Sequence, residues 1–135
     1  MHWSEKYVGK KYVDGQFDCA ELVRLVQKEI FGREVKLPTF RNHLEATGPI
    51  SKFRLMAEQV AMCKDDVAVK TKWPQEGDGV LLITRGYLQH IGVYSRINER
   101  AWILHASDGS GQVMFQRAKD LVLRGLIIEG YYKWL

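Results

Sequence analysis

The sequence predicts an α+β fold in which helices come first and an antiparallel sheet follows. Helical periodicity is confined to the first half of the chain, whereas short apolar runs separated by turns fill the second half, after residues 73–79. The chain has 135 residues, of which 46% are hydrophobic and 27% charged. This length and composition are typical of one globular domain, so we assign residues 1–135 to a single domain. Helices followed by a run of strands indicate the α+β class.

The clearest predicted helix spans residues 18–31. Asp18 is its expected N-cap, Glu21 completes a capping box three residues later, and Gly32 ends it. Apolar residues recur at a spacing of four on one face, at Leu22, Val26 and Ile30. Cys19 therefore falls in the first turn of a helix.

The remaining elements follow from periodicity and turn signals. Two further helices are predicted over 39–46 and 51–62, strands over 80–84, 89–97, 101–107, 112–116 and 126–134, and a short helix over 117–123. Gly77-Asp78 predicts a turn before the first strand, and Asn98-Glu99 predicts a turn between the second and third. The aromatic segment 131–134 is expected in the sheet core or at its edge, with a carbohydrate-stacking platform as the alternative.

Cys19 occupies a position that activates a thiol. The free N–H groups at a helix N-terminus and the positive end of the helix dipole stabilise a thiolate there. Cys63 has no comparable cap or neighbouring histidine in the sequence, so we expect it to be inert. The two cysteines show no C-x-x-C spacing, which argues against a zinc site or redox pair, and a disulfide between them is not required at this chain length.

Two histidines are predicted to share a face of one hairpin. If the turn contains only Asn98 and Glu99, then Gly92 faces His105 and His90 is the diagonal neighbour of His105. His90 would then serve as the base for Cys19 if the first helix packs its N-terminus against the sheet. His105 would fix the tautomer of His90, as the third member of a catalytic triad does.

This arrangement predicts acyl transfer through a thioester. The Cys19 thiolate attacks an amide carbonyl, the Cys19 backbone N–H faces the oxyanion, and His90 protonates the leaving amine. Tyr12, seven residues before the nucleophile, is a candidate donor to the same oxygen, and we place Asp18 with it as a substrate or oxyanion residue. The mechanism calls for no metal and no organic cofactor. His2 and His43 are expected to be solvated.

Charge and hydropathy restrict the partners. Lys and Arg number 20 against 16 Asp and Glu, which gives a net charge of +4 without a long basic run. This balance suits a polyanionic bacterial wall polymer better than nucleic acid, which we exclude as a partner. The sequence shows no signal peptide and no stretch of membrane-spanning length, so we expect synthesis in the cytoplasm and no transmembrane segment.

Four ordered motifs resemble the NlpC/P60 superfamily of papain-like cysteine peptidases. They are a tyrosine-bearing glycine loop ending in Asp-Cys at 12–19, Gly77-Asp78, His-Ile-Gly-Val-Tyr at 90–94 and His-Ala-Ser at 105–107. The match spans most of the chain. The resemblance implies the papain-like fold of that superfamily, with helices packed on an antiparallel sheet and the nucleophile at the N-terminus of the first main helix.

The resemblance also implies an activity. Members of this superfamily hydrolyse bacterial wall peptides, commonly between γ-D-glutamate and a diamino acid, which would make Cys19 the nucleophile, His90 the base and His105 the orienting group. The compact chain and its ending at 129–134 look closest to phage-associated members, which implies phage tail proteins as partners and a place in the virion or at the cell envelope. One departure is Ala20-Glu21 where the family usually has Ser-Gly, which bears on specificity. The alternatives are a phage tail assembly or structural module that keeps the fold, and a thiol acyltransferase.

Overall fold

A computed structural model describes residues 2–13, 19–35, 67–84, 87–107 and 111–135 of the chain. The predicted helices over 39–46 and 51–62 lie outside the described residues, as do Asp18, His43 and Cys63. The described elements are η1 (Trp3–Lys6), α1 (Cys19–Glu29), β1 (Ala68–Thr71), β2 (Gly79–Thr84), β3 (Tyr87–Ile97), β4 (Arg100–Ser107), β5 (Gln112–Arg117), η3 (Ala118–Arg124) and β6 (Ile127–Trp134).

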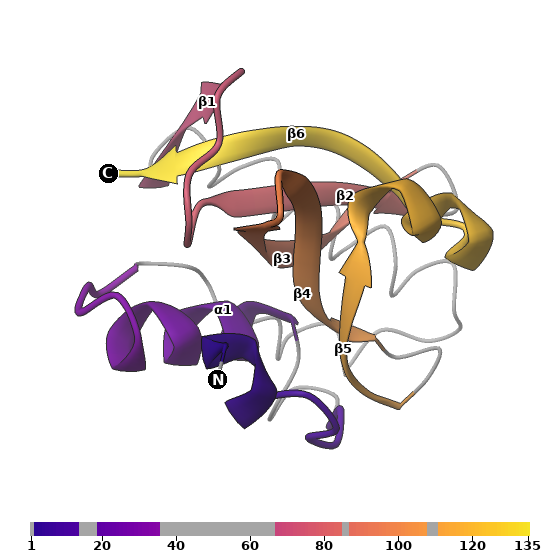
Figure 1. Ribbon diagram of the computed structural model, residues 1–135, viewed down its shortest axis with the longest axis horizontal. Coiled ribbons are helices and arrows are strands. Elements are labelled where there is room, and N and C mark those ends of the chain that lie inside the picture. The colour runs from indigo at the N-terminus through magenta and orange to yellow at the C-terminus, as the bar shows by residue number, and fades with distance from the viewer. Residues whose placement is uncertain (1, 14–18, 36–66, 85–86, 108–110) are drawn as a thin grey trace.

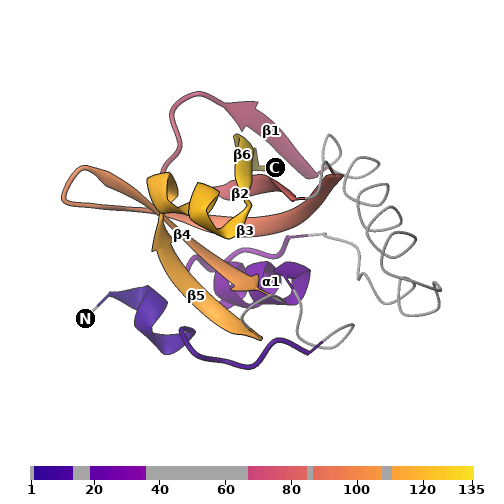
Figure 2. The same cartoon turned by 90° about the vertical axis from the view of Figure 1, so that its right-hand side faces the viewer.

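One antiparallel sheet organises these elements. Its six strands lie in the order β1-β6-β2-β3-β4-β5, and every neighbouring pair is antiparallel. Figure 1 shows α1 beneath this sheet, and Figure 2 shows β4 and β5 lying next to α1 in the turned view. The predicted α+β class and the five predicted strands are therefore confirmed within one or two residues at each end.

The β3–β4 hairpin has the register that the sequence predicts. Ile97 pairs with Arg100, so the turn consists of Asn98 and Glu99 alone, and both of these residues have positive φ, 51° and 63°. Two positive φ values in a two-residue loop are the signature of a type I′ turn, whose twist matches that of the strands. This turn sets Gly92 opposite His105.

The sheet buries a different hydrophobic cluster on each face. In the first, Ile91 and Val93 of β3 pack with the buried face of α1. In the second, Tyr94 of β3 and Ile103 of β4 pack with Leu121 of η3. Because successive side chains of a strand point to opposite faces, α1 and η3 cover opposite faces of the central strands.

The turn before β2 forms as predicted. Gly77 has a φ of 87°, and a Cβ at this position would lie 2.9 Å from the Phe31 ring, so both the backbone and the space favour glycine. The Asp78 carboxylate accepts a hydrogen bond from the Gln75 N–H at 2.8 Å and lies 3.2 Å from the Lys133 ammonium. Asp78 thus closes the turn and ties it to β6.

Two described elements are missing from the predictions. The strand β1 has only four residues and is defined by its pairing with residues 131–134 of β6, a long-range contact with no local signature. The single-turn helix η1 begins at Trp3, where His2 acts as its N-cap by accepting from the Ser4 N–H.

His2 corrects a further expectation, because it is not a solvated side chain. It is partly buried, its Nε2 lies 2.9 Å from the Ser95 hydroxyl, and its ring stacks on Phe115 with centroids 5.3 Å apart. The N-terminal segment is thereby attached to β3 and β5.

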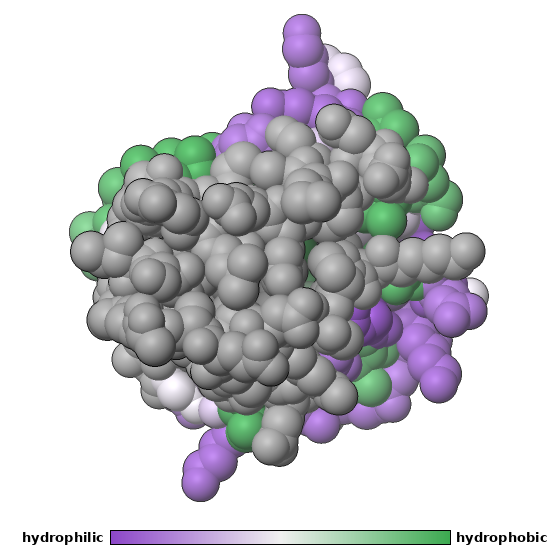
Figure 3. Space-filling model, turned by 180° about the vertical axis from the view of Figure 1, so that it is seen from behind, coloured by the Kyte–Doolittle hydropathy of each residue, from purple (hydrophilic) through white to green (hydrophobic). Residues whose placement is uncertain are grey.

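Seen from behind in Figure 3, the described residues around the rim of the molecule mix hydrophilic and hydrophobic side chains. Within the described part of the chain, no helix has both the length and the apolar character needed to cross a bilayer.

Candidate active site

His90 and His105 form a hydrogen-bonded pair. The Nε2 of His90 lies 2.9 Å from the Nδ1 of His105, and the two rings meet edge to face with centroids 5.1 Å apart. The pair follows from the register, because His105 is opposite Gly92 and His90 is two residues away on the same face. The predicted contact between the two histidines is present.

Gly92 allows the two strands to approach at this point. A Cβ at Gly92 would lie 2.7 Å from the Cγ2 of Ile103 and 2.9 Å from the Leu104 carbonyl oxygen. Any side chain would therefore push β3 away from β4, next to the place where the imidazoles meet. The glycine between His90 and Tyr94 thus has a packing reason within the hairpin.

The surroundings keep both imidazoles neutral. Burial, and next the charge of His105, lower the pKa of His90 well below its ordinary value. Burial also lowers the pKa of His105, which is 1% exposed; the hydrogen bond to Gln116 opposes this shift and the charge of Arg124 in η3 adds to it. A neutral imidazole has a lone pair that can accept a proton, while a pKa lowered this far makes the ring a weaker base at neutral pH.

Gln116 is a further neighbour of this pair, and no pattern in the sequence points to it. Its Oε1 lies 2.8 Å from the Nε2 of His105. Met114 of β5 pairs with His105, and Gln116 is two residues further along the same face. A glutamine at the end of a short predicted strand carries no local signal, and only the β4–β5 register reveals it.

Cys19 is the first residue of α1, as predicted, and its side chain is 1% exposed. It belongs to the cluster on the α1 face of the sheet, together with Ile91 and Val93. His90 has the same strand parity as Tyr94 and therefore projects from the opposite face, the one that η3 covers. The structure thus brings the two histidines together, and the contact of Cys19 with His90 stays a prediction.

Tyr12 and Asp18 are the two residues predicted near the oxyanion, and the structure describes Tyr12. The Tyr12 N–H donates to the Gly111 carbonyl at 2.9 Å, and its partly buried ring packs against the α1 cluster. The segment that carries Tyr12 therefore runs beside the start of β5. Asp18 is outside the described residues, so both residues stay predictions as substrate contacts.

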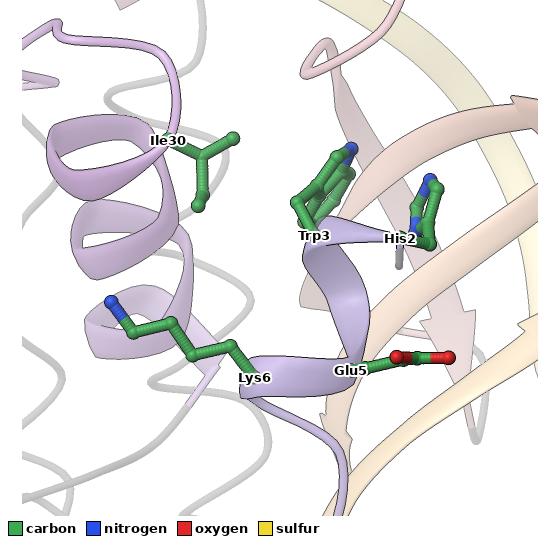
Figure 4. A pocket seen from close by; sticks show the side chains of 5 residues that line it. All are labelled: His2, Trp3, Glu5, Lys6 and Ile30. Atoms are coloured by element: carbon green, nitrogen blue, oxygen red, sulfur yellow. The ribbon is translucent and has the colours of Figure 1, made fainter.

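A shallow pocket of about 490 Å³ lies elsewhere, between η1 and the end of α1. It is lined by His2, Trp3, Glu5, Lys6 and Ile30. Figure 4 shows Lys6 extending toward α1 and Glu5 pointing away from it. None of the predicted site residues lines this pocket. Among the described residues, no group of three or more His, Cys, Asp and Glu side chains is placed to hold a metal ion.

Comparison with models of protein families, with curated proteins and with solved structures finds no match to this chain. The resemblance carried by the four motifs therefore stays a prediction. The structure shows the α+β class, and the papain-like arrangement within that class also stays a prediction.

Proposed function

We propose that this protein is a cysteine peptidase or amidase of the NlpC/P60 type, which hydrolyses peptide bonds of the bacterial cell wall. The observation that carries the proposal is the hydrogen bond between the His90 Nε2 and the His105 Nδ1 at 2.9 Å, formed by the strand register that the two-residue turn sets. The position of Cys19 at the start of α1 adds a nucleophile of the required kind.

In the proposed reaction, His90 first takes the proton of the Cys19 thiol, and the resulting thiolate attacks the carbonyl carbon between γ-D-glutamate and a diamino acid. A C–S bond forms and the carbonyl electron pair becomes an oxyanion, which the Cys19 N–H faces. The oxyanion collapses, the C–N bond breaks and the amine leaves with a proton from His90. Water then attacks the thioester, His90 takes its proton, and the C–S bond breaks to restore the thiolate.

This reaction requires the sulfur at the start of α1 to reach the ring of His90, whereas strand parity sets the two side chains on opposite faces of β3. The proposal therefore depends on this contact, which a reactivity measurement tests. A thiolate activated by a helix end and an imidazole reacts with alkylating agents at neutral pH, whereas a thiol that stays within an apolar cluster is inert. We therefore expect Cys19 to be alkylated by iodoacetamide at pH 7 faster than Cys63 in the folded protein, with peptide mass mapping as the measurement. Equal rates at the two cysteines contradict the proposal.

The activity test uses defined wall peptides and mass analysis of their products. We expect cleavage by the wild-type chain and loss of cleavage to background in the Cys19→Ala variant, because the nucleophile is removed. Cys63→Ala is the matched control and is expected to retain the activity. Products with a new amine in place of water would identify the acyltransferase alternative.

A second candidate is a structural or binding module, such as a phage tail component, and the 1% exposure of Cys19 within an apolar cluster favours it. In that case the thiol contributes packing alone, and Cys19→Ala retains full partner binding. The hydrolase proposal places the chain at the cell envelope during phage entry, whereas the module would stay in the virion. The alkylation rates decide between the two candidates.

A further inference from the structure

Three polar side chains form a diagonal line across the sheet, on the face that η3 covers. They come from three adjacent strands, His90 from β3, His105 from β4 and Gln116 from β5. His105 pairs with Gly92 on β3 and with Met114 on β5. His90 is two residues from Gly92, and Gln116 is two residues from Met114, so both lie diagonally next to His105 on the same face. The line is thus a product of two strand registers.

The hydrogen bonds along this line have one direction. The amide oxygen of Gln116 faces the His105 Nε2 at 2.8 Å, and an oxygen there can only accept, so the His105 proton lies on Nε2. In neutral His105 the Nδ1 is then a bare acceptor. It accepts from the Nε2–H of His90 at 2.9 Å, which leaves the lone pair of His90 on Nδ1.

We propose that Gln116 is a positioning residue that fixes the tautomers of both histidines, so that Nδ1 of His90 is the basic nitrogen. The role rests on the proposed thiol chemistry, in which His90 takes and returns a proton. In this role Gln116 acts through His105, with which it shares a hydrogen bond. An amide rotated by 180° would reverse every donor along the line and leave a proton on Nδ1 of His90, where a base needs a lone pair.

The location of Gln116 suits this role. His105 is 1% exposed, so solvent does not compete for its ring nitrogens. The amide oxygen of Gln116 therefore determines its tautomer. Gln116 itself is partly exposed on the strand at one edge of the sheet. Substitution at an edge position of this kind changes the hydrogen bond with little change to the core.

The direct test is NMR of the imidazole nitrogens in ¹⁵N-labelled protein at neutral pH. We expect both His90 and His105 in the Nε2–H form in the wild-type chain. In Gln116→Met, which keeps the length of the side chain and removes the acceptor, both rings should become mixtures of tautomers. Gln116→Glu restores an oxygen acceptor and should restore the Nε2–H form. Gln112→Met, the same change on the same strand, is the control and should leave both rings unchanged.

Two outcomes overturn the inference. One is an Nδ1–H form of both rings in the wild-type chain, and the other is an unchanged pair of tautomers in a folded Gln116→Met variant. Circular dichroism and the unfolding midpoint establish that the variants fold.

Kinetics on wall peptides supply a second readout. We expect kcat to fall about 10- to 100-fold in Gln116→Met with KM unchanged, as for other residues that orient a reactive group through a hydrogen bond. In Gln116→Glu we expect kcat to recover. If the wild-type chain cleaves no wall peptide while the tautomers respond as expected, the proposed function fails and the positioning role stands. If the wild-type chain is active and Gln116→Met alters neither tautomer nor kcat, the positioning role fails alone.

Discussion

At the scale of single residues, the two imidazoles hold each other in place through a hydrogen bond. His105 is closed off from solvent, and it bonds to His90 on one side and Gln116 on the other. A buried polar ring is tolerated when both of its nitrogens have partners, because an unpaired one would cost about 1–3 kcal/mol. The same bonds hold the rings in fixed orientations, which is what proton transfer requires.

This environment predicts a dependence of stability on pH. The pKa of both His90 and His105 is lowered in the folded chain, chiefly by burial, whereas the unfolded chain titrates near 6.5. Below about pH 6.5 the unfolded chain therefore binds protons that the folded chain does not, so the free energy of unfolding should fall as the pH falls. Urea unfolding at pH 7.5, 6.5 and 5.5 measures this slope.

The control for the pH series is His90→Gln, whose amide can donate to His105 without titrating. We expect a shallower fall in stability for this variant, by up to about 1.4 kcal/mol per pH unit for one proton. An identical slope in the two proteins would show that His90 does not change its protonation on unfolding.

At the scale of elements, the β3–β4 turn determines whether the site exists. A one-residue change in the turn would move His90 relative to His105 and send one ring to the other face of the sheet. Asn98 tolerates a positive φ better than most residues, but Glu99 has a φ of 63° with a full side chain. The register is therefore kept at the expense of backbone strain at Glu99.

Glu99→Gly should relieve this strain. We expect the variant to be more stable by about 0.5–1 kcal/mol, because the left-handed conformation costs roughly 1–2 kcal/mol for a residue with a Cβ and the glycine loses part of that gain through its freer unfolded chain. Urea unfolding measures the difference. Glu99→Ala is the control, and an equal gain in both variants would assign the effect to the lost charge.

At the scale of the whole molecule, the N-terminal segment is fastened to the sheet by a polar network. The Ser95 hydroxyl, fully buried in β3, lies 2.9 Å from the His2 Nε2 and donates to the Glu76 carboxylate. Glu76 also accepts from the Trp3 indole N–H at 3.1 Å and from the Arg96 backbone N–H. The network joins η1, the turn before β2 and β3, elements that lie far apart in the sequence.

Ser95→Ala should release this segment. We expect a loss of about 1–3 kcal/mol in the free energy of unfolding, because His2 and Glu76 both lose a partner next to the core. Amide hydrogen exchange should quicken in residues 2–7 more than in β4. Glu5→Ala, at an exposed position of η1, is the control and is expected to change stability by less than about 0.5 kcal/mol. Equal exchange in the wild type and Ser95→Ala would contradict a fastening role.

Features that depend on neighbours along the chain follow from the amino-acid sequence alone. The start of α1 at Cys19, the turn at Gly77-Asp78 and the two-residue turn at Asn98-Glu99 all follow from local capping and turn chemistry. The turn length was enough to pair His90 with His105, because side chains of a hairpin alternate with a period of two.

Features that join distant segments depend on how the chain packs in three dimensions. Gln116 reaches His105 through the β4–β5 register, β1 exists through its pairing with β6, and His2 is held by Ser95. The sequence also does not predict which face of the sheet α1 covers. An amphipathic helix has one apolar side, which can pack on either face. Local propensity is set within a few residues, whereas burial and register are set by contacts between segments, and these contacts carry no signature in either segment alone.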